Sequence, residues 1–191
     1  DPGERVWLVH RKLAALLKER RPGKTVMMTS YQPTRLPPRS LDSFPDNVAI
    51  RLTRYRPEDF AMWEAWGGKE IPKSLYTTSW LTVHPRVTPW VAVNMVRLFQ
   101  KNHIQGMYLC GGIIENSRGN WYPWGLGGPG FYAFFRALHD PKVDPVAMRA
   151  EFVNAAFGKA APPMQNFFAA LDERMDQFWW LYRADRQNSP P

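Results

Sequence analysis

The stretch TPWVAVNMVRLFQKNHIQGMYLC, residues 88–110, decides the fold class of this chain. Thr88 and Pro89 form an N-cap and first-turn signal, and apolar residues then recur at helical spacing, which predicts a helix over residues 89–102. The apolar, β-rich run at residues 104–110 follows almost at once and predicts a buried strand. A helix that leads directly into a strand is typical of a parallel α/β sheet.

The same alternation extends over the rest of the chain. Three further runs rich in apolar, β-branched or aromatic residues predict strands at residues 25–31, 47–53 and 74–81. Helical spacing and cap signals predict helices that begin near residues 4, 57, 130, 144 and 162. Strands that alternate with helices indicate a parallel sheet, so the predicted class is α/β. Four strands are too few to close a (β/α)8 barrel, which leaves a small open sheet or one half of a barrel.

The composition excludes several classes of protein. The 45% hydrophobic content excludes intrinsic disorder, no apolar run is long enough to predict a membrane span, and the single Cys excludes an intramolecular disulfide. The 25 Lys and Arg against 17 Asp and Glu give a formal net charge of +8, which is compatible with nucleic-acid binding. The positive residues form no block, however. The densest cluster lies on and just after the first predicted helix and consists of Arg11, Lys12, Lys18, Arg20, Arg21 and Lys24.

Chemistry-bearing residues gather where the predicted strands end. Ligands bind at the C-terminal ends of the strands in parallel α/β folds. The first three predicted strands place six candidate binding residues at or near this end: Tyr31, Gln32, Arg51, Arg54, Trp80 and His84. A glycine-rich loop is predicted after the fourth strand, and its candidates are Glu115, Asn116, Trp121, Tyr122 and Trp124.

These residue types favour carbohydrate chemistry. Aromatic residues make up 14% of the chain, and Trp and Tyr rings stack on the C–H groups of sugar rings while Gln, Asn, Arg and His bind hydroxyls. Arg51 or Arg54 is expected to pair with a carboxylated sugar. Glu115 is the single good candidate for a catalytic acid or base, although glycoside hydrolysis normally uses two carboxylates. No metal-binding, dinucleotide or P-loop motif occurs, so no metal or cofactor is predicted.

Several segments resemble one known family. They are Thr29-Ser30-Tyr31-Gln32-Pro33-Thr34, Phe44-Pro45-Asp46-Asn47-Val48, the fourth predicted strand with Gly106, and two tracts from Ala133 to Pro141 and from Phe152 to Met164. In order and spacing they resemble domain-of-unknown-function family 4838 over most of residues 5–175. The resemblance implies the C-terminal half of a (β/α)8 barrel in bacterial proteins similar to α-glucuronidase-like and hexosaminidase-like glycoside hydrolases.

The resemblance carries further expectations. An N-terminal half of the same chain would complete the barrel, and the protein would be secreted, periplasmic or on the cell surface. One position departs from the family pattern, since Leu109 stands where the family often has Glu in the fourth strand. Either that acid is absent or Glu115 takes its role from the loop.

The predicted organisation is a half barrel over residues 1–141, followed by a helical appendix over residues 142–191 that packs on it. The predicted function is part of a carbohydrate-binding and carbohydrate-cleaving cleft, with a carbohydrate partner, no nucleic acid and no membrane span. The alternatives are a non-catalytic carbohydrate-binding barrel and a basic nucleic-acid-binding domain. An open half barrel leaves two bare sheet edges, so the isolated fragment is expected to aggregate or dimerise.

Overall fold

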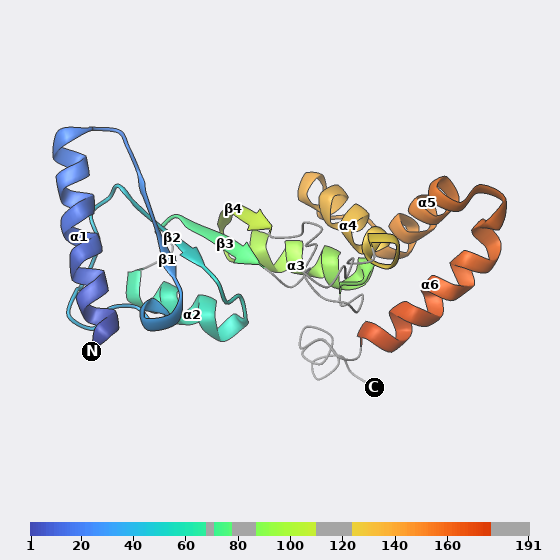
Figure 1. The fold of residues 1–191 in the computed structure, drawn as a ribbon, viewed down its shortest axis with the longest axis horizontal. Coiled ribbons are helices and arrows are strands. Elements are labelled where there is room, and N and C mark those ends of the chain that lie inside the picture. The colour runs from blue at the N-terminus through green and yellow to red at the C-terminus, as the bar shows by residue number, and fades with distance from the viewer. Residues whose placement is uncertain (68–70, 78–86, 110–123, 177–191) are drawn as a thin grey trace, which may run out of the picture. The chain divides into compact units, whose positions relative to one another are not determined.

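The structure of the chain is a computed structural model that describes residues 1–67, 71–77, 87–109 and 124–176. It divides into two compact units (Figure 1). The first comprises Asp1–Thr77 and Asn102–Leu109 and contains the sheet, while the second comprises Thr78–Lys101 and Cys110–Pro191 and is helical where it is described. The division expected at residue 141 stays a prediction.

Four parallel strands form one sheet in the first unit. They are β1 (Val26–Ser30), β2 (Val48–Leu52), β3 (Lys73–Thr77) and β4 (Ile104–Leu109), and their spatial order is β1-β2-β3-β4. Each strand pairs with its neighbour in the sequence, as in one half of a (β/α)8 barrel, whereas the strand order of a doubly wound sheet reverses. The predicted α/β class with four parallel strands is therefore confirmed.

The two faces of this sheet differ sharply. Residues aligned across parallel strands share a face, and one face carries the buried side chains of Met28, Ile50, Leu52 and Leu75. The other face carries smaller or polar side chains together with aromatic ones, and we call it the inner face. Its aligned members are Met27, Thr29, Ala49, Arg51, Ser74, Tyr76, Gly106 and Tyr108.

The core of the first unit is built around tryptophans. Trp7 of α1 (Pro2–Arg20) is buried and packs edge-on against Trp63 of α2 (Pro57–Gly67), with ring centroids 5.8 Å apart. Phe44 lies against both Trp7 and Trp66, at centroid distances of 5.4 and 4.9 Å. Trp7 and Trp63 are thus core residues rather than part of a stacking surface for a ligand.

The buried side of α1 differs from the apolar stripe that the sequence suggests. Helical spacing predicts a stripe through Val6, Val9, Leu13, Leu16 and Leu17. The structure instead buries Gly3, Trp7 and Ala14 and leaves Val9, Leu13 and Leu16 exposed. On the buried side, Gly3 permits a close approach of the loop after β1. A Cβ on Gly3 would lie 2.0 Å from the backbone oxygen of Pro33.

The segment between β1 and β2 is the irregular loop that its prolines predict, with one short 3-10 turn, η1 (Gln32–Thr34). Two indole groups hold it to the helices: Trp7 Nε1 donates to Leu36 O and Trp66 Nε1 to Leu41 O, each at 3.0 Å. Glu4 adds a third attachment, because its carboxylate accepts hydrogen bonds from the backbone N–H groups of Arg39, at 2.8 Å, and Ser40, at 3.1 Å.

The Glu4 attachment predicts a pH dependence of stability. The hydrogen bonds from the Arg39 backbone and the Ser40 hydroxyl hold the pKa of Glu4 below its ordinary value. The stabilisation is present above that ordinary value and is lost as the pH falls through the lowered folded-state pKa. Urea unfolding should therefore find Glu4→Gln less stable than wild type near neutral pH, with a smaller difference near pH 3. An equal difference at both pH values would contradict this attachment.

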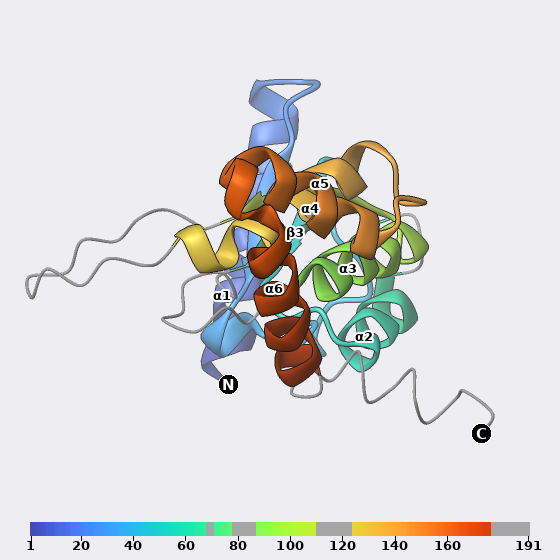
Figure 2. The ribbon, with the colours of Figure 1, turned by 90° about the vertical axis from the view of Figure 1, so that its right-hand side faces the viewer.

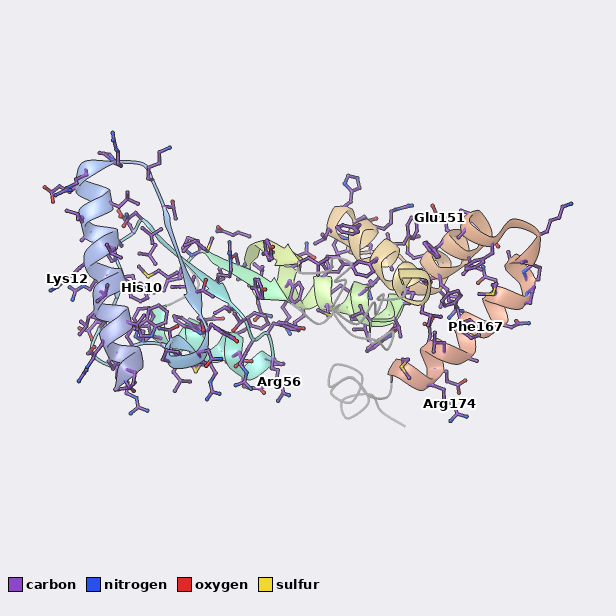
Figure 3. The ribbon with its side chains drawn as sticks, viewed as in Figure 1. His10, Lys12, Arg56, Glu151, Phe167 and Arg174 are labelled. Carbon is purple, nitrogen blue, oxygen red and sulfur yellow. The ribbon has the colours of Figure 1, made fainter. Side chains whose placement is uncertain are left out.

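The second unit is a set of packed helices: α3 (Pro89–Lys101), α4 (Trp124–His139), α5 (Pro145–Phe157), η2 (Gly158–Ala160) and α6 (Ala161–Asp176) (Figure 2). Phe168 of α6 and Val153 of α5 are buried together. Arg149 of α5 and Asp172 of α6 form a half-buried ion pair at 2.9 Å. On α5, Glu151 pairs with Arg136 of α4 at 2.8 Å and so ties these two helices together (Figure 3).

The start of α4 corrects one expectation. The glycine-rich tract through residue 130 was expected to be a loop, with a helix from about residue 130, but α4 already begins at Trp124. The glycines serve close packing there. A Cβ on Gly128 would lie 2.4 Å from the Phe152 ring, and a Cβ on Gly130 would lie 1.9 Å from the backbone oxygen of Val87. Glycine therefore marks a tight contact of α4 here, not a turn.

Candidate functional site

Arg51, Tyr76 and Tyr108 form a cluster on the inner face, at the C-terminal ends of three neighbouring strands. The rings of Tyr76 and Tyr108 are stacked, with centroids 5.2 Å apart and planes within 2° of parallel. Their register explains the contact, because Tyr76 of β3 is aligned with Tyr108 of β4. The guanidinium carbon of Arg51 lies 5.9 Å from the Tyr108 ring centroid, within cation–π range.

The arginine in this cluster has spare hydrogen-bonding capacity. Its Nε is buried and has no hydrogen-bond partner within the part of the chain that the structure describes. Buried polar groups are almost always satisfied, so an unpaired one calls for an explanation such as a ligand. A guanidinium presents donors in a planar fork that matches a carboxylate.

Apart from Arg51 itself, the residues aligned with Arg51 across the sheet have small side chains. Arg51 is aligned with Thr29 on β1 and Ser74 on β3, and Ser74 is aligned with Gly106 on β4. A Cβ at Gly106 would meet nothing within 4 Å, so open space lies beside this row. The Tyr108 side chain is 52% exposed. Within the described residues, the inner face therefore presents an aromatic surface and the cation of Arg51 beside a row of small residues.

Four residues predicted from the sequence lie at the adjacent ends of β1 and β2. Arg51 belongs to β2 and Arg54 is exposed just beyond it, while Tyr31 and Gln32 are exposed just beyond β1. Thr53 Oγ1 donates to Ser30 O at 2.7 Å and holds the two strand ends together. Gln32 Nε2 donates to Tyr31 Oη at 3.2 Å. The structure thus gathers these four residues at one edge of the sheet.

The remaining predicted residues are not placed at this site. Six of them lie outside the described residues: Trp80, His84, Glu115, Asn116, Trp121 and Tyr122. Trp124 is the first residue of α4 and belongs to the second unit. Their roles stay predictions.

Sequence reasoning missed the two tyrosines of the cluster. Tyr76 and Tyr108 lie inside predicted strands, whereas most ligand-binding residues of parallel α/β folds are expected in the segments that follow the strands. Alternation offers a signal, because Tyr76 is two positions from Ser74 and Tyr108 two positions from Gly106, which puts each pair on one face. The contact between the tyrosines, in contrast, depends on the register of β3 and β4.

The described residues contain no group of three or more His, Cys, Asp or Glu side chains that could hold a metal ion. None of the described helices is both long and apolar enough to cross a membrane.

Four sequential parallel strands with a polar and aromatic inner face define an α/β protein whose sheet corresponds to one half of a (β/α)8 barrel. The family model described as "Domain of unknown function (DUF4838)" matches residues 3–169. The chain therefore belongs to this family, as the resemblance predicted. A search of curated proteins and a search of solved structures each returned no match.

Proposed function

We propose that the inner face forms part of a carbohydrate-binding cleft in a glycoside-hydrolase-like barrel. The observation that supports this proposal is the stacked pair of Tyr76 and Tyr108 beside Arg51, at the strand ends where parallel α/β folds bind ligands. The exposed Tyr108 ring, beside the half-buried Tyr76 ring, provides an apolar surface for the C–H face of a sugar. Hydroxyl groups of the sugar would reach Gln32 and Arg54 at the neighbouring strand ends.

Arg51 indicates the kind of sugar that fits best. Its buried Nε lacks a partner within the described residues, and the aromatic face beside it cannot accept a conventional hydrogen bond. A carboxylated sugar, such as a uronic acid, would supply two oxygens to the guanidinium fork. A neutral sugar would form no charge-assisted hydrogen bond with this guanidinium and should therefore bind more weakly.

Catalysis is assigned to Glu115, which lies in the segment after β4. It would act as general acid or base, and a second carboxylate would come from elsewhere in the intact protein. One observation favours the non-catalytic alternative: the described residues of the inner face include no Asp or Glu. Leu109 stands where the resemblance places an acid. It is aligned with Thr77 and, being the next residue after Tyr108, belongs to the opposite face of the sheet.

The binding half of the proposal is tested by calorimetry with the intact protein and a panel of uronic acids and matching neutral sugars. Arg51→Gln should weaken uronate binding by roughly 10-fold to 100-fold, because a charge-assisted hydrogen bond contributes about 1.5–3 kcal/mol. The same substitution should weaken the binding of neutral sugars much less. Arg56→Gln is the matched control, since Arg56 is exposed and forms an ion pair with Glu58 at 3.8 Å. Equal losses for uronates and neutral sugars would remove Arg51 from the proposal.

The catalytic half is tested by hydrolysis of aryl glycosides and aryl uronides. If Glu115 is the general acid or base, Glu115→Gln should lower turnover by roughly 100-fold or more while sugar binding is kept. Unchanged turnover would assign the carboxylates to another part of the protein. Sugar binding by the wild type without turnover on the whole panel would favour the non-catalytic barrel.

A further inference from the structure

The outward side of α1 carries an apolar surface that the fold of the first unit does not cover. Leu8, Val9, Leu13 and Leu16 are all at least 40% exposed, and Val9 and Leu13 exceed 50%. The opposite side of the helix buries Gly3, Trp7 and Ala14. Single exposed leucines are ordinary on protein surfaces, but four on one side of one helix are a patch.

Three cations are interleaved with these aliphatic side chains. At 100° per residue, Arg5, Lys12 and Arg20 fall with the four aliphatic residues inside an arc of roughly 140°. All three cations are exposed. In Figure 3, Lys12 extends from the outer side of α1, while His10 lies on the other side of the helix. We call this set of seven residues the α1 outer face.

The acidic residues nearby leave this positive charge largely uncompensated. The Glu4 carboxylate is engaged by the Arg39 and Ser40 backbone, on another side of the helix. Asp46 is paired with Lys18 at 2.7 Å. Glu19 is the one acid of α1 within the arc, and Arg21 and Lys24 add further exposed cations just after the helix. The α1 outer face is therefore both apolar and net positive.

This combination selects among the possible partners. A second copy of the chain docked on the same face would bring like charges together. A nucleic acid would pair with the cations but would leave the four aliphatic side chains in water. A membrane surface with anionic lipids satisfies both groups, because aliphatic side chains enter the acyl boundary while Lys and Arg extend their charged ends to the headgroups.

We propose that the α1 outer face docks the protein on a membrane surface that contains anionic lipid. The helix lies flat on the surface, as an interfacial amphipathic helix does, and does not cross the bilayer. The first unit would thereby be held beside the membrane by α1. This inference does not rest on carbohydrate binding, since none of the seven residues belongs to the inner face.

The test is co-sedimentation of the full-length protein with phosphatidylcholine vesicles that contain about 30% phosphatidylglycerol, and with pure phosphatidylcholine vesicles. Binding is expected with the mixed vesicles and is expected to be much weaker with the neutral ones. Lys12→Glu should weaken it by about 30-fold, because two units of charge change near the surface. Leu13→Ser should weaken it by about tenfold through lost apolar insertion.

Matched controls come from the second unit. Val146→Ser changes an aliphatic side chain of α5 that is 57% exposed, and Lys159→Glu changes an exposed cation of η2. Neither should alter vesicle binding, and circular dichroism checks that all four variants are folded. The proposal is overturned if the mixed vesicles do not bind the protein, which is the result expected if the N-terminal half of the barrel covers the α1 outer face instead. It is also overturned if Lys12→Glu acts while Leu13→Ser has no effect, because that result indicates a purely electrostatic partner such as a nucleic acid.

Discussion

Trp7→Ala should lower the free energy of unfolding by about 3–5 kcal/mol, which is the usual cost of removing a large buried aromatic side chain. Trp7 is 1% exposed and lies against His10, Phe44 and Trp63. Its truncation would open a cavity where α1, α2 and the loop after β1 meet.

The measurement is urea unfolding of wild type and variant, followed by far-ultraviolet circular dichroism. Leu8→Ala is the matched control, because Leu8 is the next residue of the same helix and is exposed, and it should change stability by less than about 0.5 kcal/mol. Trp7→Phe separates the contribution of the buried ring from that of the indole hydrogen bond. It keeps a ring in the core but removes the donor to Leu36 O, and should cost about 1–2 kcal/mol. A loss below about 1 kcal/mol for Trp7→Ala would show that this cluster is not the core.

Gly130→Ala should also destabilise the protein, although Gly→Ala inside a helix normally stabilises it. Alanine has the higher helix propensity, by about 1 kcal/mol. At Gly130, however, the new Cβ would lie 1.9 Å from the backbone oxygen of Val87 and 3.0 Å from its carbonyl carbon. Backbone atoms cannot rotate away as a side chain does, so α4 would have to move. We expect a net loss of about 2–3 kcal/mol, at the upper end of overpacking costs.

Gly127→Ala provides the control within the same helix. Its nearest neighbour would be the Phe131 ring at 3.6 Å, which is ordinary van der Waals contact. The higher helix propensity of alanine should then decide the outcome, and the free energy of unfolding should rise by up to about 1 kcal/mol. Thermal unfolding of the two variants beside wild type gives shifts of opposite sign. Stabilisation by Gly130→Ala would mean that α4 does not lie against Val87.

Local sequence patterns were sufficient to predict which segments form helices and which form strands. The strand at residues 104–110 and the helix before it are recognisable because apolar residues recur with the period of each element. Capping residues and prolines mark where the elements end. These signals give the parallel α/β class and the irregular loop before β2, while the family follows from the resemblance of particular segments. They also identify Arg51, because a charged residue in an otherwise apolar strand stands out without any knowledge of the neighbours.

Other features depended on contacts between distant segments. Periodicity predicts one apolar stripe on α1, but the structure buries the side that carries Gly3, Trp7 and Ala14, where Gly3 lies close to Pro33. The glycines of α4 carry a loop signal in the sequence, yet they are helical because Phe152 and Val87 occupy the space where side chains would lie. In both cases a local preference was outweighed by packing that the local sequence does not encode.

The amino-acid sequence alone therefore determined that this protein has four strands alternating with helices, a parallel sheet and an arginine near the binding end of one strand. The spacing of apolar residues, helix caps and turn residues depends on only a few neighbouring positions, so these signals are visible in the sequence itself. Tertiary structure decided that Tyr76 stacks on Tyr108, that Arg51 lies beside this pair, and that α1 turns Leu8, Leu13 and Leu16 outward. The physical reason is register: a shift by one residue between β3 and β4 would separate the two tyrosines while leaving every local pattern unchanged.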